Sequence, residues 1–198
     1  LHLCDRRQRQ MCIRDSYKGA LTVSGENFVD VRVPMKINVQ KRTLPDPAQW
    51  VFHLDLWQNP YAVARYYNVP LWSRQHFDIM KPLMQQLANA GQKVITASVM
   101  HHPWAGQTED PFDSMVFRMK KIDGSWVYDY TVFDRWVEFM MSLGIDRQIN
   151  CYTLVPWALK FDYYDQATNR IRFVEAKPGE AAYEDYWFSF LKDFAGHL

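Results

Sequence analysis

Apolar and polar residues alternate with a period of two in the N-terminal part of the chain. The alternation runs through residues 20–23, 28–33 and 35–39, and a turn-forming Ser-Gly-Glu-Asn stretch interrupts it at residues 24–27. This pattern predicts two or three short strands with one apolar face, which need a partner sheet to be stable. We therefore interpret residues 17–43 as the C-terminal strands of a β-sandwich domain, and the proline-containing residues 44–49 as a linker.

From residue 50 onward, strand-like runs alternate with amphipathic helical ones. Ser73 is the expected N-cap of the first helix, Asp129 is that of the second, and Pro82 is expected to kink or split the first. The pattern predicts strands and helices in the order strand 51–57, helix 73–90, strand 93–100, helix 129–144, strand 148–155 and helix 180–197.

Strands that alternate with helices pair in parallel through right-handed crossovers, which predicts an α/β fold. Both a doubly wound sheet and a (β/α)8 barrel have this pattern. No glycine-rich phosphate loop follows any strand, and the strand-to-helix connections are long enough for β-hairpins with turns at Asp123–Gly124 and Thr168–Asn169. Long loops after the strands are typical of barrel enzymes. We therefore predict that residues 50–198 form a partial (β/α)8 barrel, containing about its first three βα units.

The first sixteen residues, LHLCDRRQRQMCIRDS, differ in composition from the rest. They contain four Arg and no Lys, and they lack the apolar stretch of a secretory signal. The string resembles the translation of a sequencing adapter, so we predict that residues 1–16 are not native to the protein. Without them, the formal net charge of +1 becomes slightly negative, and Cys151 is the one cysteine that remains.

Charge and composition exclude several classes of partner. The 198 residues include 23 Lys+Arg and 22 Asp+Glu, so no electrostatic attraction to nucleic acid is expected. No apolar run approaches the ~18 residues of a membrane-spanning helix. Aromatic residues make up 16% of the chain, with 8 Trp, 11 Tyr and 12 Phe. This content exceeds what packing alone usually requires and favours a flat, partly polar ligand.

Polar and aromatic side chains gather at the predicted carboxyl ends of the three strands, which a barrel brings to one face. Aromatic rings can cover the C–H side of a sugar, while Asn, Gln, Asp and His bond its hydroxyls. We therefore interpret this group as a carbohydrate site. The candidate substrate-binding residues are His53, Asp55, Trp57, Gln58, Trp104, Asn150, Tyr152 and Trp157.

Each of these assignments has a structural alternative. Packing at the top of the barrel explains each Trp equally well. Period two places His53, Asp55 and Trp57 on the polar face of the first strand, which is expected to point into the barrel, and the apolar face is expected to meet the helices. Asp55 is then either a substrate contact or one half of a structural pair with a His.

Other chemistries find less support in the sequence. His101 and His102 are neighbours and would point to opposite faces of a strand, so neither a metal site nor any other cofactor is expected. Cys151 has no base at a motif spacing and is interpreted as a small buried strand residue. The acidic pairs at 109–110 and 184–185 are not at strand ends and are expected to be solvated. No catalytic residue is assigned.

Three long strings carry a resemblance to a known family. They are LPDPAQWVFHLDLWQNPYAVARYY, AGQKVITASVMHHPWAGQTEDPFDSMV and GIDRQINCYTLVPW. Together they resemble the catalytic domain of glycoside hydrolase family 123, over Tyr17 to the end of the chain. The resemblance implies a β-sandwich followed by a (β/α)8 barrel, and an exo-β-N-acetylgalactosaminidase. It also implies a retaining, substrate-assisted mechanism. The 2-acetamido oxygen of the sugar attacks its own anomeric carbon, an Asp orients the acetamido group, and the following Glu is general acid and base.

The resemblance places that Asp-Glu pair at the end of the fourth barrel strand, and no residue of this chain matches it. We expect the pair beyond Leu198 and expect the chain alone to be inactive. The implied partner is a glycan with a terminal N-acetylgalactosamine, and the implied setting is secreted or periplasmic in a bacterium. Two alternatives stay open: a non-catalytic glycan-binding protein with a degenerate barrel, and a barrel glycosidase for another sugar.

Overall fold

The computed structural model describes residues 16–40, 43–110 and 112–198. These residues divide into two compact units, with the division between Asp46 and Pro47. Of the residues predicted not to be native, 1–16, only Ser16 lies within the described part, so this stays a prediction.

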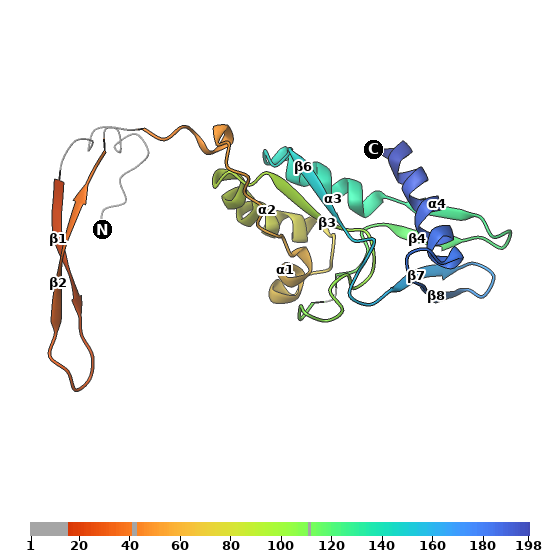
Figure 1. The fold of residues 1–198 in the computed structure, drawn as a ribbon, viewed down its shortest axis with the longest axis horizontal. Helices are drawn as coiled ribbons and strands as arrows, with labels where there is room; N and C mark the ends of the chain where they lie inside the picture. The colour runs from red at the N-terminus through yellow and green to blue at the C-terminus, as the bar shows by residue number, and fades with distance from the viewer. Residues whose placement is uncertain (1–15, 41–42, 111) are drawn as a thin grey trace. The chain divides into compact units, whose positions relative to one another are not determined.

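The first unit contains an antiparallel hairpin of β1 (Ser16–Val23) and β2 (Val31–Asn38) (Figure 1). The two strands predicted on either side of Pro34 form one strand, because each strand of a two-stranded sheet is an edge that tolerates a residue without an N–H. The register, which pairs Leu21 with Val33, gathers the apolar side chains on one face. That face is exposed and consists of Tyr17, Leu21, Val23, Val31, Val33, Met35 and Ile37.

The second unit has a mixed α/β fold with two sheets (Figure 1). Its elements are η2 (Pro47–Gln49), α1 (Pro60–Tyr67), α2 (Arg74–Asn89), β3 (Val94–Ser98), β4 (Phe117–Lys120), β5 (Trp126–Asp129), α3 (Thr131–Ser142), β6 (Gln148–Tyr152), β7 (Lys160–Asp165), β8 (Arg170–Glu175) and α4 (Ala181–His197). β3 and β6 pair in parallel. The two hairpins inserted after them, β4–β5 and β7–β8, join into a four-stranded sheet with the order β5-β4-β7-β8. Both predicted hairpins and all three predicted helices are confirmed.

The strand predicted at residues 51–57 is wrong. Only Leu54 pairs, in a parallel bridge to Gln92. Beyond it, side chains replace the backbone ladder: the Leu56 N–H donates to Gln92 Oε1 (2.9 Å), and the Gln58 N–H donates to Thr96 Oγ1 (3.3 Å). The apolar face predicted for this strand is not packed on helices, since Phe52 and Leu56 are exposed.

Helix boundaries also differ from the prediction. α2 runs unbroken through Pro82, because Met80 and Met84 are buried on both sides of the proline and hold the two halves in place. The N-cap of α3 is Tyr130, although the Asp129 carboxylate accepts the Thr131 N–H at 2.8 Å. α1 was not predicted. It begins with Asn59 as N-cap and Pro60 at its first position, a sequence signal for a helix start.

The core of the second unit lies between the sheets and their covering helices. α3 packs on β3, where Trp136 is fully buried and donates its Nε1–H to Thr96 O at 2.9 Å. α4 covers the four-stranded sheet, with Trp187 and Phe190 buried and the Trp187 ring 5.4 Å from that of Phe161. Each such fully buried side chain contributes roughly 1.5–3 kcal/mol. The packing fixes both inserted hairpins beside the parallel strands.

Candidate functional site

Five of the predicted site residues meet in the structure. Asp55 Oδ2 accepts the Asn150 Nδ2–H at 3.0 Å. The rings of Trp57, Trp104 and Tyr152, which we call the aromatic cluster, lie 4.9–5.5 Å apart between centroids. They come from the segment after Leu54, the loop after β3 and the end of β6, so the prediction that these segments converge is confirmed.

The three rings of the aromatic cluster have different surroundings. Trp104 is only 9% exposed and also contacts Phe112 at 4.5 Å, which makes it a packing residue. Trp57 rests on the other two rings and leaves 59% of its surface exposed. An exposed indole on a fixed aromatic support is suited to cover the C–H face of a sugar.

The carboxylate of Asp55 has one oxygen engaged and one available. Gln148 Nε2 donates to Asn150 Oδ1 at 2.6 Å, which fixes the Asn150 amide so that its Nδ2 faces Asp55 Oδ2. Asp55 Oδ1 is buried and has no hydrogen-bond partner among the described residues. A buried acceptor without a partner costs about 1–3 kcal/mol, so a donor from a ligand would be stabilised there. The structure thus pairs Asp55 with an Asn and not with the His considered from the sequence.

Tyr152 places a hydroxyl beside this carboxylate. Burial, and then the nearby charge of Asp55, raise the pKa of Tyr152 above its ordinary value. A phenol is protonated at neutral pH even at its ordinary pKa, so the Tyr152 hydroxyl can donate a hydrogen bond there.

Three predicted residues are placed elsewhere. His53 lies in a shallow hollow with Lys93 and Gln148, at the amino ends of the parallel strands. The amide of Gln58 is occupied by backbone groups: its Oε1 accepts the Thr96 N–H at 2.8 Å, and its Nε2 donates to Leu56 O and to Val94 O. Gln58 therefore joins the segment to β3 and has no free group for a ligand.

Trp157 is 72% exposed on the loop after β6, and its backbone N–H donates to Pro103 O at 3.4 Å. This bond places the loop beside the one that carries Trp104. Trp157 is therefore at the expected end of the strands, although its ring contacts none of the three rings of the cluster.

The ionisable groups of the loop after β3 form pairs. His101 Nδ1 is 2.8 Å from Asp113 Oδ1, and the two histidine rings are 3.9 Å apart. Burial and the neighbouring His101 hold the pKa of His102 below its ordinary value. Within the described residues, no group of three or more metal-ligating side chains occurs.

The prediction that the acidic pair at 109–110 is solvated is wrong for Asp110. Its side chain is 9% exposed and binds Arg65 through two bonds, Nε to Oδ1 at 2.6 Å and Nη2 to Oδ2 at 3.1 Å. Glu109 remains exposed. Asp110 thus fixes the loop after β3 to α1, a helix that the sequence analysis missed.

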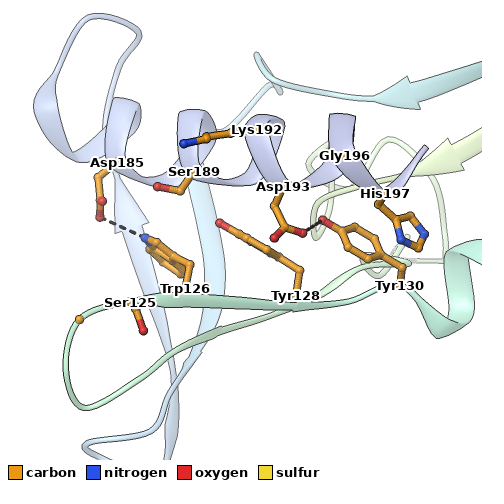
Figure 2. Close-up of a pocket in the computed structure, with 11 residues that line it drawn as sticks. Ser125, Trp126, Tyr128, Tyr130, Asp185, Ser189, Lys192, Asp193, Gly196 and His197 are labelled. Atoms are coloured by element: carbon orange, nitrogen blue, oxygen red, sulfur yellow. Dashed lines mark hydrogen bonds between the residues drawn. The ribbon is translucent and has the colours of Figure 1, made fainter.

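A second site lies between β5 and α4 (Figure 2). We call it the β5–α4 groove; its volume is about 840 Å³. Trp126, Tyr128 and Tyr130 form one wall. The other wall is the α4 face that carries Asp185, Ser189, Lys192, Asp193 and His197. This groove was not predicted from the sequence, although aromatic residues at alternate positions along β5 and directly after it indicate one aromatic face.

Hydrogen bonds fix both ends of the groove. At one end Asp185 Oδ2 accepts from Lys120 Nζ (2.9 Å) and from Trp126 Nε1 (3.4 Å). At the other end the Tyr130 hydroxyl donates to Asp193 Oδ1 at 2.7 Å, and the His197 ring stacks on Tyr130 at 4.0 Å. Hydrogen bonds between the two walls therefore fix their separation.

Residues 57–198 match the family model described as the catalytic domain of glycoside hydrolase 123. The chain belongs to glycoside hydrolase family 123. The family 123 match contains the whole aromatic cluster, Asn150 and the β5–α4 groove, while His53 and Asp55 precede its first residue. The resemblance seen in the sequence is confirmed.

A solved structure gives the same placement. It is a family 123 glycoside hydrolase from Clostridium perfringens, analysed for the details of glycolipid glycan hydrolysis. The similarity has a TM-score of 0.80 at 29% identity and covers 93% of this chain and 33% of the other. The family 123 chain described here thus spans about a third of the length of that protein. The comparison with curated proteins found no match to the present chain. No helix in the described parts of the chain is long and apolar enough to cross a membrane.

Proposed function

We propose that this chain is part of a retaining exo-β-N-acetylgalactosaminidase that removes terminal β-linked N-acetylgalactosamine from glycans. The observation that carries the proposal is the juxtaposition of the Asp55–Asn150 pair with the aromatic cluster, in a chain of family 123. The parallel set formed by the Leu54 bridge, β3 and β6 then supplies the first strands of a (β/α)8 barrel. The hairpin of the first unit, with its exposed apolar face, belongs to a β-sandwich domain.

The site residues have distinct roles in this proposal. The Trp57 indole covers the C–H face of the sugar, supported by Trp104 and Tyr152. Asp55 Oδ1 accepts a hydrogen bond from a sugar hydroxyl or from the acetamido N–H. Asn150 is a positioning residue, because it holds the other oxygen of Asp55.

The reacting groups come from the sugar and from residues outside this chain. The acetamido oxygen attacks the anomeric carbon, an Asp orients the acetamido group, and the following Glu protonates the leaving oxygen and then activates water. In the 198 residues no Asp is followed directly by a Glu; the two adjacent acidic pairs, at 109–110 and 184–185, have the order Glu-Asp. We therefore propose that the pair lies on the strand that follows α4 and that the chain alone does not hydrolyse glycosides.

The test compares the complete gene product from the source DNA with the 198-residue chain, using 4-nitrophenyl N-acetyl-β-D-galactosaminide. Release of nitrophenol by the complete protein alone, with retention of configuration seen by NMR, is expected. Trp57→Ala and Asp55→Asn in the complete protein should lower kcat/KM by about 10-fold or more, the equivalent of one lost charged hydrogen bond or ring contact.

Other outcomes separate the alternatives. Binding of the sugar by the complete protein without turnover indicates a glycan-binding protein. Turnover of another glycoside and none of this one indicates a glycosidase of different specificity. Wild-type kcat/KM in both variants would remove the aromatic cluster and Asp55 from the substrate site.

A further inference from the structure

We propose that the β5–α4 groove is a second carbohydrate-binding site, separate from the aromatic cluster, that holds a neutral sugar unit of a glycan. Its volume of about 840 Å³ lies within the range of roughly 300–1,000 Å³ that is usual for small-molecule sites. The proposal goes beyond hydrolysis, because it needs neither the Asp-Glu pair nor the rest of a barrel.

The two walls of the groove have complementary chemistry. Trp126 and Tyr128 lie on the α4-facing side of β5, because side chains alternate between the two faces of a strand, and Tyr130, directly after the strand, continues this wall (Figure 2). The opposite wall carries Ser189 and Lys192, whose side chains form no hydrogen bond or ion pair within the described part of the chain. A sugar presents C–H groups on one side and hydroxyls on its edge, which matches an aromatic wall facing free donors and acceptors.

The hydroxyl of Tyr128 provides an independent indication of a ligand. Figure 2 shows this phenol pointing from β5 toward α4. Its oxygen is buried and finds no hydrogen-bond partner among the described residues. Native proteins rarely leave a buried hydroxyl unpaired, since the loss of its bonds to water is not compensated. A sugar hydroxyl in the groove would supply the missing partner.

The charges of the groove favour a neutral ligand over an ion. Asp185 is paired with Lys120, Asp193 accepts the Tyr130 hydroxyl through one oxygen, and the described residues contain no group of three side chains that could hold a metal ion. Lys192 contributes one positive charge, but the two nearby carboxylates offset its attraction for an anionic ligand. The hydroxyls of a neutral sugar can form hydrogen bonds with the carboxylates and with the ammonium group and add no charge to the groove.

The experiment measures binding of lactose and of methyl N-acetyl-β-D-galactosaminide to the 198-residue chain by saturation-transfer NMR and by titration of ¹H–¹⁵N spectra. A dissociation constant on the order of 1 mM is expected for a ligand of this size in an open groove. Shifts should centre on the Trp126 indole N–H and on α4. Tyr128→Phe should weaken binding about 5-fold, because it removes one hydrogen bond. Lys192→Ala, at an exposed position, should also weaken it.

Matched variants separate binding from folding. Tyr128→Phe removes an unpaired hydroxyl, so the thermal midpoint of the free chain should stay equal or rise. Tyr130→Phe removes a hydroxyl that is already bonded to Asp193, so the midpoint should fall. Trp57→Ala should leave the groove shifts unchanged. No sugar-dependent shifts at 20 mM, full affinity in both Tyr128→Phe and Lys192→Ala, or loss of all binding in Trp57→Ala would each overturn the proposal, whatever the outcome for hydrolysis.

Discussion

Replacing Gln58 by Ala should destabilise the chain without affecting a sugar site. The side chain is 2% exposed, and its amide bonds the backbone of β3 and of its own segment. After the change, Leu56 O and Val94 O still accept from Gln92 Nε2, at 3.1 and 2.7 Å. The Thr96 N–H, whose acceptor is Gln58 Oε1, is left buried without its partner.

The magnitude follows from that count of surviving partners. One orphaned buried N–H costs about 1–3 kcal/mol, and loss of the packed side-chain atoms adds roughly 1 kcal/mol. The free energy of unfolding should therefore fall by about 2–4 kcal/mol. The loss would be larger if the Leu56 and Val94 carbonyls were also left without a donor.

Urea unfolding followed by tryptophan fluorescence measures this change. Gln85→Ala is the matched control, because the Gln85 amide bonds only Asn89 at the surface of α2, and it should change stability by less than about 0.5 kcal/mol. A loss below 1 kcal/mol for Gln58→Ala, together with weaker binding of methyl N-acetyl-β-D-galactosaminide at the aromatic cluster, would refute the reasoning and return Gln58 to the substrate site.

Three further changes test separate contacts. Asp110→Asn should lower the thermal midpoint more than Glu109→Gln, since Asp110 is buried in a two-bond contact and Glu109 is exposed; equal midpoints would contradict this. Burial lowers the pKa of His76, so the unfolded state takes up the proton first. The free energy of unfolding should fall as the pH drops below about 6.5, and His76→Gln should flatten that part of the pH profile. Leu21→Lys should reduce self-association in sedimentation velocity while Thr22→Lys, on the opposite face of the hairpin, should not.

Hydrophobic periodicity predicted the regular elements of the chain because most of them have one buried face. α2, α3 and α4 each bury the stripe that the sequence displays, and both inserted hairpins turn at the expected glycine or asparagine. The pattern failed at residues 51–57, where alternation is present but side-chain amides take the place of the strand ladder. These side-chain hydrogen bonds depend on Gln92 and Thr96, which are distant in sequence from residues 51–57. No local feature of the segment indicates them.

The candidate site was predictable where it depends on the convergence of chain segments and not where it depends on side-chain partners. Asp55, Trp57 and Asn150 were identified because the segments that carry them were expected to converge; Asp55 does bond Asn150, and the Trp57 ring does contact that of Tyr152. His53 and Gln58 have the same residue chemistry within a few positions of Asp55. His53 lies level with the starts of β3 and β6, beside Lys93 and Gln148. The Gln58 amide turns toward the backbone of β3, a direction that the sequence alone does not determine.

The aromatic surplus of the chain has two physical origins, and burial separates them. Trp136 and Trp187 are fully buried, and the ring of Trp187 contacts those of Phe161 and Phe190, so the α4–sheet interface accounts for much of the composition by packing alone. Trp57 and Trp126 differ, because each is held by neighbouring rings yet keeps part of its surface open. Holding an indole in place without burying it leaves apolar area exposed, which folding by itself does not favour. A ligand that covered these rings would supply the missing burial, at the aromatic cluster for Trp57 and in the β5–α4 groove for Trp126, as the two proposals require.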